Sequence, residues 1–362
     1  MKSKIAFSVV PKFENMAAMA DLVAEAQERT KGYLPTIQAA LDAQRAAGAG
    51  TAPPLIADAT VYNGKVRDVY SPACAPRHVV LCATGRQSAF DRALAVVPFK
   101  GSVLNQVSAW WFAETRAITP NHVVAAPLPD CVVAKKCRAF PIEFVVRGYI
   151  TGSTSTSMWT HYKGGARVYC GIDLPDGLEK NAKLAKPLCT PTTKDVEHDV
   201  PISPADIVAS GRMTQAEWDH CSATALAVFA KGQAVAASRG LILVDTKYEF
   251  GVDDDGTILL IDEVQTPDSS RYWLAASYEA RIAAKQEPEN IDKEFLRLWY
   301  RERCDPYKDA VIPDAPDDLV CELSRRYILL FELITGQRFD FAAASAKTDR
   351  AAVMAAALAK LA

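Results

Sequence analysis

The chain has 362 residues, 49% of them hydrophobic, and its 41 Lys and Arg against 43 Asp and Glu leave a net charge of −2. This length exceeds one typical domain and favours two domains with a cleft between them. The near-zero charge provides no global field to hold nucleic acid or an anionic membrane, so phosphate chemistry must come from local clusters.

The nine cysteines are odd in number and include no CxxC pair. This pattern is typical of reduced thiols in the cytoplasm and argues against a disulfide framework or a zinc site. No run of 18 apolar residues could cross a bilayer, and the apolar run before Pro11 is too short for a signal peptide. We therefore expect a soluble cytoplasmic protein without a membrane or nucleic-acid partner.

Residues 1–57 look like an added N-terminal segment. Residues 14–47 predict one or two helices, broken between Gly32 and Pro35, and a Gly- and Pro-containing linker follows at 48–54. A packing or assembly element without chemistry is the simplest interpretation of this extension.

Two lobes are expected after the extension. Residues 58–138 alternate short strands in a pattern that predicts a β-rich, largely antiparallel lobe. Residues 139–362 mix loops, strands and helices and predict a larger α/β lobe. Within it, Thr214 and Glu217 form a capping box for a helix that ends near Gly240.

The first anion-binding candidate is a turn in which Gly64 precedes Lys65 and Arg67. A glycine turn lets backbone amides approach a phosphate while the lysine supplies charge. A solvated hairpin tip is the alternative, and no GxxxxGK[ST] phosphate loop occurs anywhere in the chain.

Two further segments concentrate polar groups. In the first, Arg147 ends an apolar strand and Ser153 opens a hydroxyl cluster, a combination suited to a phosphate monoester; a surface turn with Arg147 in a structural ion pair is the alternative. In the second, Lys194, His198 and Asp199 lie within ten residues flanked by prolines. Their spacing does not separate catalytic groups from ordinary surface groups.

The stretch from Asp245 to Trp273 predicts a hairpin with a two-residue type I′ turn at Asp255-Gly256. This register places Glu249 directly opposite Asp262, and like charges in that position are destabilising unless a cation lies between them. Lys247 projects from the same face as Glu249. The arrangement predicts a Mg²⁺ and phosphate site; a solvated hairpin is the alternative.

Ser270 and Arg271 follow closely behind the hairpin. The rigid turn at Pro267 would direct Arg271 back into the cleft that holds the carboxylates.

Taken together, these segments resemble those of the SAICAR synthetases, the phosphoribosylaminoimidazole-succinocarboxamide synthetases of purine synthesis. The resemblance runs from Val61 to Trp299 and is carried in order by GKVRDVY, SAFDRAL, KGSVLNQVSAWWF, EFVVRGYITGS, TPTTKDVEHD, GLILVDTKYEFG, LLIDEVQTPDSSRYW and IDKEFLRLW.

The resemblance implies an α+β or α/β fold of two lobes, with a β-rich ATP-binding lobe over an α/β lobe, related to ATP-grasp and kinase architectures. It also implies a carbon–nitrogen ligase that joins L-aspartate to carboxyaminoimidazole ribonucleotide through an acyl phosphate, with ATP as co-substrate and Mg²⁺ as cofactor. These small molecules are the expected partners. A homo-oligomer stays open, because nothing in the sequence fixes the number of subunits.

Roles are carried over only to matching positions. For the nucleotide and metal, the resemblance implies Lys65, Arg67, Lys135 and Glu249 at ATP, and Glu249 with Asp262 at Mg²⁺. For the ribonucleotide phosphate it implies Arg147, Ser153, Ser270 and Arg271. For the reacting groups it implies Lys247, Lys194, His198 and Asp199.

One position departs from the family pattern. Gly85 stands where many members have an acid, so Asp91 would have to replace any ligand contact of that acid. Two other classes of function remain as alternatives, a small-molecule kinase of related architecture and a non-catalytic nucleotide sensor or assembly subunit. Only the ligase requires L-aspartate.

Overall fold

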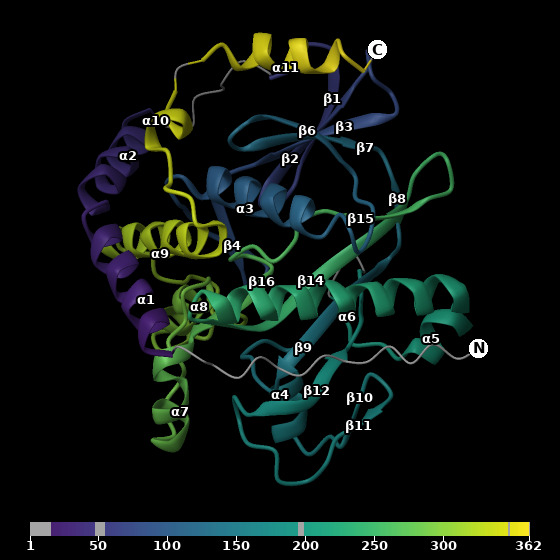
Figure 1. Ribbon diagram of the computed structural model, residues 1–362, viewed down its shortest axis with the longest axis vertical. Helices are drawn as coiled ribbons and strands as arrows, with labels where there is room; N and C mark the ends of the chain where they lie inside the picture. Colours follow the sequence, from purple (N-terminus) through teal and green to yellow (C-terminus); the bar gives the residue numbers. More distant parts are fainter. Residues whose placement is uncertain (1–15, 48–54, 195–198, 347, 362) are drawn as a thin grey trace.

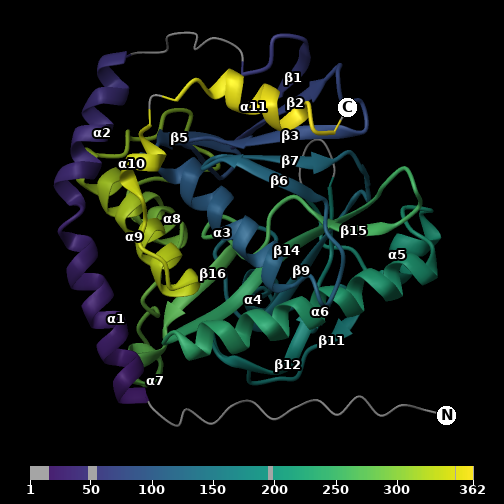
Figure 2. The ribbon, with the colours of Figure 1, turned by 45° about the horizontal axis from the view of Figure 1, so that its top comes forward.

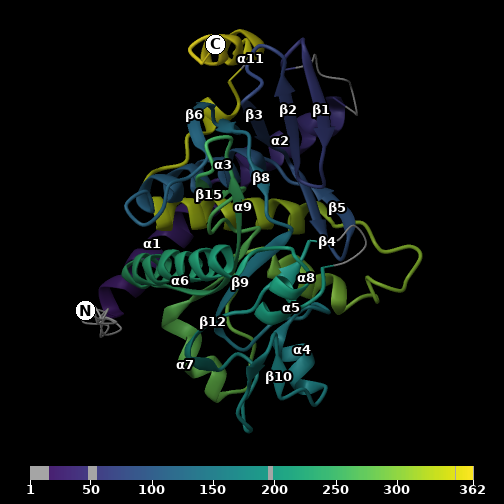
Figure 3. The same cartoon turned by 90° about the vertical axis from the view of Figure 1, so that its right-hand side faces the viewer.

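The computed structural model describes residues 16–47, 55–194, 199–346 and 348–361. Their α-helices and β-strands form two lobes, each built on an antiparallel sheet (Figures 1 and 3). The α+β, two-lobed prediction is confirmed.

The first lobe is a five-stranded sheet in the order β1-β2-β3-β7-β6. Its strands are β1 (Ala59–Asn63), β2 (Arg67–Pro72), β3 (His78–Ala83), β7 (Cys131–Lys135) and β6 (Val123–Leu128). A separate hairpin, β4 (Arg86–Ala89) with β5 (Arg92–Val96), leads into α3 (Lys100–Glu114). Helix α3 packs against β3 and β7 on one face of the sheet.

The end of the chain covers the other face of this sheet. Helix α11 (Arg350–Leu358) packs on β6 (Figure 3). Its Met354 and Leu358 share one hydrophobic cluster with Val80, Leu128 and Val133. The chain therefore returns to the first lobe, whereas the sequence division placed all of 139–362 in the second.

The second lobe is organised by β14 (Leu241–Val252). Its first half pairs with β9 (Ile142–Tyr149) and β16 (Ser270–Leu274), and its second half pairs with β15 (Ile258–Ile261) and the short β8 (Arg138–Ala139). Strands β12 (Lys183–Cys189) and β13 (Thr192–Thr193) extend the sheet beside β9. The second half of β14 thus reaches the base of the first lobe.

Helices surround the second sheet. The capping box of α6 (Gln215–Ser238) is present as predicted, with the Thr214 hydroxyl accepting from the Glu217 N–H and the Glu217 carboxylate accepting from the Thr214 N–H. The smaller elements are α4 (Met158–Lys163), β10 (Val168–Tyr169), β11 (Ile172–Asp173), α5 (Pro204–Ala209), α7 (Ala275–Ala283), α8 (Glu294–Arg301) and α10 (Phe341–Ala344).

The described residues 16–47 of the N-terminal extension form the two predicted helices, α1 (Met16–Lys31) and α2 (Leu34–Ala47). Both helices pack along α9 (Asp317–Thr335), which in turn packs on α3 (Figure 2). The buried Glu332 of α9 accepts hydrogen bonds from Arg29 Nη2 at 2.8 Å and from the Tyr33 hydroxyl at 3.0 Å. The extension is therefore anchored to the helical layer behind the cleft.

The prediction of reduced thiols is wrong for one pair. Cys82 of β3 and Cys131 of β7 stand directly opposite each other in the ladder and form a disulfide. The two residues are 49 positions apart, so their pairing follows from the sheet order and not from any local pattern.

Among the described residues, no helix combines the length and the apolar character that crossing a membrane would need.

The hairpin at the end of β14 has a different turn from the predicted one. Gly256 has φ of +81°, whereas Asp255 does not have a positive φ. The Asp253 carboxylate accepts from the N–H groups of Asp255 and Thr257, at 3.1 and 2.9 Å. This is a three-residue loop closed by a left-handed glycine, because the Asp253 side chain stabilises the tighter first turn.

The register changes as a result. Glu249 pairs with Ile261, not with Asp262 as predicted. A one-residue shift would move a side chain to the opposite face of a regular strand. Asp262 nevertheless reaches the cleft, because it lies just after β15 with a φ of +66°.

Replacing Gly256 with Ala should lower the free energy of unfolding by about 1–2 kcal/mol, the cost of a left-handed residue with a Cβ. No atom lies within 4 Å of the added Cβ, so the effect would be backbone strain alone. Asp254→Ala in the same loop is the control, and urea unfolding is the measurement. Equal stability of both variants would contradict the observed turn.

Candidate active site

A cavity of about 350 Å³ lies between the lobes and is lined from both of them. Lys65 and Val66 contribute from the first lobe, and strands β9, β14 and β16 contribute from the second. Charged side chains dominate its walls. One part of the cavity is organised around Lys247 and another around Arg147.

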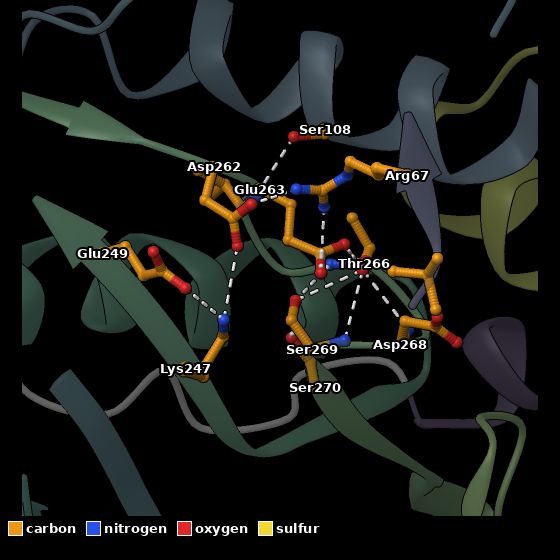
Figure 4. A network of polar contacts seen from close by, with 12 residues as sticks. Arg67, Ser108, Lys247, Glu249, Asp262, Glu263, Thr266, Asp268, Ser269 and Ser270 are labelled. Carbon is orange, nitrogen blue, oxygen red and sulfur yellow. Dashed lines mark hydrogen bonds and ion pairs between the residues drawn. The ribbon is translucent and has the colours of Figure 1, made fainter. Parts of the chain in front are cut away.

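Lys247 is the centre of the first part (Figure 4). Its ammonium lies 2.5 Å from Glu249 Oε1, 3.2 Å from Asp262 Oδ2 and 3.4 Å from Glu143 Oε1. Burial alone would lower the pKa of this lysine, but the surrounding carboxylates raise it well above its usual value. Lys247 thus places a positive charge between Glu249 and Asp262, the two carboxylates predicted for Mg²⁺.

Asp262 connects the two lobes. It is ion-paired with Arg67 of β2 as well as with Lys247. Burial would raise the pKa of Asp262, but the charges of Arg67 and Lys247 hold it far below its usual range. This carboxylate is therefore ionised at neutral pH.

Arg67 spans two carboxylates. Besides Asp262 it contacts Glu263, with Nη2 3.0 Å from Oε1. Glu263 is further held by the Thr266 hydroxyl at 2.6 Å (Figure 4). The predicted phosphate-binding arginine is therefore placed against the carboxylates of the second lobe.

The other nucleotide candidates lie at the edge of the cleft. Lys65, in the turn between β1 and β2, is exposed, and its Nζ lies 2.7 Å from Asp91 Oδ1. Lys135 ends β7, where the chain passes between the lobes, and pairs with Asp253 at 2.7 Å. Lys65 lines the cavity, whereas Lys135 lies beside the hairpin.

Gly85, which stands where many family members have an acid, does not line this cavity. A Cβ at this position would lie 3.0 Å from the Val97 carbonyl oxygen, so the backbone leaves little room for a side chain. Asp91 does not line the cavity either, but it is paired with Lys65, which does.

The segment 190–199 reaches the same cavity. Lys194 is ion-paired with Glu249 Oε2. Asp199 lines the cavity, and the loss of solvation together with the nearby Glu143 raises its pKa to about 6. His198 lies outside the described residues.

Arg147 and Arg271 define the second part of the cavity. Both lie close to Asp245, Arg147 with Nη1 at 3.5 Å and Arg271 with Nη1 at 2.7 Å. Arg147 Nε also donates to the Thr190 hydroxyl at 2.9 Å. Arg271 Nη2 also lies 3.4 Å from Glu294 Oε2, so each arginine is paired with a carboxylate, and both arginines line this end of the cavity.

The hydroxyl cluster contributes differently from the prediction. The Ser153 hydroxyl donates to Glu294 at 2.6 Å, and Ser153 is not a lining residue of the cavity. The lining hydroxyls of that turn are those of Thr154 and Thr156. Ser270 lines the cavity, and its hydroxyl donates to the Thr246 hydroxyl at 2.8 Å.

Sequence reasoning missed several lining residues. Lys293 and Arg297 come from the IDKEFLRLW segment, in which no site residue was predicted. Burial lowers the pKa of Lys293 to about 8, against the raising effect of Asp268. A Lys and an Arg four residues apart were the available signal, because this spacing brings side chains to one helical face.

Glu249 and Asp262 fit a magnesium ion that is bound partly by the protein and partly by substrate phosphates. No group of three or more His, Cys, Asp or Glu in the described parts of the chain is arranged to hold a metal. Glu249 and Asp262 offer two carboxylates close together, and Mg²⁺ is often bound by one or two carboxylates plus substrate phosphates. Two carboxylates of this kind would supply part of a magnesium shell, and the phosphates of a nucleotide would complete it.

Comparisons with known proteins point to one family. The family model for SAICAR synthetase matches residues 60–313. The phosphoribosylaminoimidazole-succinocarboxamide synthase of Legionella pneumophila (strain Paris) is 60% identical over 280 residues, which cover 77% of this chain and 89% of that protein. The chloroplastic enzyme of that name from Arabidopsis thaliana is 62% identical over 278 residues, covering 77% and 67%.

A solved structure shows the same fold. The SAICAR synthase of Saccharomyces cerevisiae, complexed with SAICAR, is 30% identical and superposes with a TM-score of 0.67, covering 80% of this chain and 99% of that one.

The low pKa of Asp262 predicts a specific pH dependence. Because its folded pKa lies below the unfolded value, its ionisation stabilises the fold above about pH 5, and this contribution is lost as the pH falls. The free energy of unfolding falls in the parent between pH 6 and pH 3. In the Asp262→Asn protein this decrease should be smaller by about 1 kcal/mol.

Urea unfolding at both pH values measures this difference. Asp254→Asn, which changes an exposed carboxylate of the same hairpin, is the control. If the free energy of unfolding falls as much between pH 6 and pH 3 in the Asp262→Asn protein as in the parent, the ion pairing of Asp262 is contradicted.

Proposed function

The chain belongs to the SAICAR synthetase family and is an ATP-dependent ligase of purine biosynthesis, and we propose that the two parts of its cavity hold the two phosphate-bearing substrates. Carboxyaminoimidazole ribonucleotide would bind with its phosphate at Arg147 and its carboxylate towards Lys247. ATP would bring its terminal phosphate to Lys247 from the first lobe. L-Aspartate would enter from the side of Asp199.

The observation that supports this arrangement is the register of the central strands. Asp245 pairs with Arg147 across β14 and β9, and Lys247 lies two residues further along β14. Two residues of strand span about 7 Å. A ribonucleotide held by its phosphate at Arg147 could therefore place a distant carboxylate within reach of Lys247.

The reaction requires this proximity. A carboxylate oxygen is a poor leaving group, so ATP first transfers its terminal phosphoryl group to the ribonucleotide carboxylate and leaves ADP. The aspartate amine then attacks the acyl carbon, forms the amide and releases phosphate. Positioning and charge neutralisation are the main contributions of a protein to such transfers.

Lys247 would neutralise the charge that develops on the transferred phosphoryl group. Its pairing with Glu249 and Asp262 keeps it protonated, which favours this role. Glu249 and Asp262 would hold Mg²⁺, which, when bound, neutralises phosphate oxygens. Lys65 and Arg67 would contact the nucleotide phosphates, and Lys135 would lie near the adenine.

The ribonucleotide phosphate would be held by Arg147, Arg271 and Ser270, with Lys293 and Arg297 adding positive charge. Planar guanidinium groups make paired hydrogen bonds to phosphate that a lysine cannot reproduce. Ser153 would act indirectly, because its hydroxyl is bound to Glu294.

Asp199 would accept a proton from the amine of L-aspartate. Its raised pKa of about 6 leaves it ionised at neutral pH yet basic enough to take up a proton. Lys194, paired with Glu249, would help to orient a carboxylate of L-aspartate, and His198 stays a candidate from the sequence. The cytoplasmic location and the homo-oligomer likewise stay predictions.

The direct test is ADP release from Mg²⁺ and ATP, with the ribonucleotide and L-aspartate added singly and then together. We expect turnover only with both, accompanied by the succinocarboxamide product. ADP release that does not require L-aspartate would favour the kinase alternative. No turnover under any condition would favour a nucleotide-binding protein without catalysis.

Replacing Arg147 with Lys should raise the KM of the ribonucleotide by about 10-fold or more and leave the KM of ATP nearly unchanged, because a charge-assisted hydrogen bond contributes about 1.5–3 kcal/mol. Steady-state kinetics with each substrate varied in turn measures this. Equal increases in both KM values would place Arg147 outside the ribonucleotide site.

The role of Asp199 predicts the acid limb of the pH profile. A base with a pKa of about 6 loses activity as the pH falls through that value. Asp199→Asn should lower kcat/KM for L-aspartate by about 10²-fold at pH 8 and abolish the limb near pH 6. An unchanged limb in the variant would assign it to another group.

A further inference from the structure

Asp268 is a cavity-lining carboxylate with partners on three different elements behind the cavity wall. Lys100 Nζ of α3 lies 2.8 Å from Asp268 Oδ2. The Tyr327 hydroxyl of α9 donates to Asp268 Oδ1 at 2.6 Å, and the Gln87 amide of β4 approaches the same oxygen at 3.5 Å. Residues from both lobes and from the helical layer thus meet at one side chain.

These partners are completely buried. Lys100, Gln87 and Tyr327 each have 0% of their surface exposed. Removing a lysine charge and two other polar groups from water is costly unless each is paired. A carboxylate at a cavity wall could be neutralised by one lysine, so neutralisation alone does not explain the hydrogen bonds on its other oxygen.

The hydrogen bonds on Oδ1 fix the rotation of the carboxylate. An ionised carboxylate accepts about four hydrogen bonds. Both hydrogen bonds, from Tyr327 and Gln87, are on Oδ1, whereas Lys100 is ion-paired with Oδ2. The accepting capacity that remains is therefore mainly on Oδ2, and Asp268 lines the ligand cavity. Burial would raise the pKa of Asp268, but Lys100 and Lys293 hold it far below its usual range. Oδ2 is therefore a fixed, charged acceptor.

We propose that Tyr327 is a positioning residue of the ligase: its hydroxyl orients Asp268 to accept a hydrogen bond from a hydroxyl or amino group of the ribonucleotide. This proposal rests on the proposed function. Tyr327 lies beyond residues 60–313, the range matched by the family model. The helix that carries it also anchors the N-terminal extension, since Arg325 of α9 donates to the Thr30 hydroxyl at 3.0 Å.

Tyr327→Phe keeps the ring and removes only the hydroxyl. Loss of a hydrogen bond to a charged acceptor should weaken ribonucleotide binding about 10-fold, and we expect the Kd and the KM of the ribonucleotide to rise together. The KM of ATP should change less than about 2-fold. Calorimetry measures the Kd and steady-state kinetics the KM values.

Tyr33→Phe is the matched control. It also removes a tyrosine hydroxyl that donates to a carboxylate of α9, at 3.0 Å from Glu332, but Glu332 does not line the active-site cavity. Both variants should lose comparable stability in urea, and only Tyr327→Phe should weaken ribonucleotide binding. Equal binding by the two variants would overturn the proposal and leave Tyr327 a structural residue.

A double-mutant cycle tests whether Tyr327 acts through Asp268. Asp268→Asn should itself weaken ribonucleotide binding, and adding Tyr327→Phe should weaken it no further. A second 10-fold loss in the double variant would contradict the mechanism.

Calorimetry measures ribonucleotide binding without turnover, so it can test the role of Tyr327 independently of the ligase activity. Parent protein that binds the ribonucleotide without turning over would refute the ligase assignment alone, and the Tyr327 comparison would still decide the positioning role. Parent protein that does not bind the ribonucleotide would refute both.

Discussion

The ammonium group of Lys247 is the interaction on which the rest of the site depends. Three carboxylates, those of Glu143, Glu249 and Asp262, lie within 3.4 Å of it. Such a concentration of negative charge beside a hydrophobic core is stable only with cations among the carboxylates. Lys247 supplies the central cation, and Lys194 and Arg67 supply the others. The same charge balance suits a cavity that receives a magnesium-bound nucleotide.

This cluster also explains how two lobes form one site. Strand β14 runs through the second lobe and ends in a hairpin beneath the first, so Lys247 and Glu249 lie at the junction. Arg67 reaches from β2 of the first lobe to Asp262 and Glu263 of the second. Behind this junction, α9 connects the N-terminal helices to Asp268. The extension that the sequence left without a role is thus part of the support for the cavity wall.

Much of the site could be predicted because it is local in sequence. Lys247 and Glu249 are two residues apart on one strand, so their common face followed from strand geometry. The register of Asp262 could not be obtained this way, because the Asp253 side chain selects a three-residue turn over the expected type I′ turn. Asp262 still reaches the cluster because its backbone is left-handed. No residue pattern in the sequence predicts this conformation.

Contacts between distant segments could not be predicted at all. The Cys82–Cys131 disulfide depends on β7 being inserted beside β3, and the Asp268 network joins residues from positions 87 to 327. Arg147 Nη2 donates to the carbonyl oxygen of Thr156 in the 153–157 turn. Ser153 instead contacts Glu294 of α8, a segment far away in the sequence.

The central claim is that the Lys247 cluster is a metal and phosphate site, and electron paramagnetic resonance of Mn²⁺ tests it most directly. In the presence of ADP, the parent protein should bind one Mn²⁺ per chain, and Glu249→Gln and Asp262→Asn should each lose it. Asp254→Asn, in the exposed hairpin loop, should keep it. Binding of Mn²⁺ that survives both cluster substitutions, or that does not depend on ADP, would contradict the account.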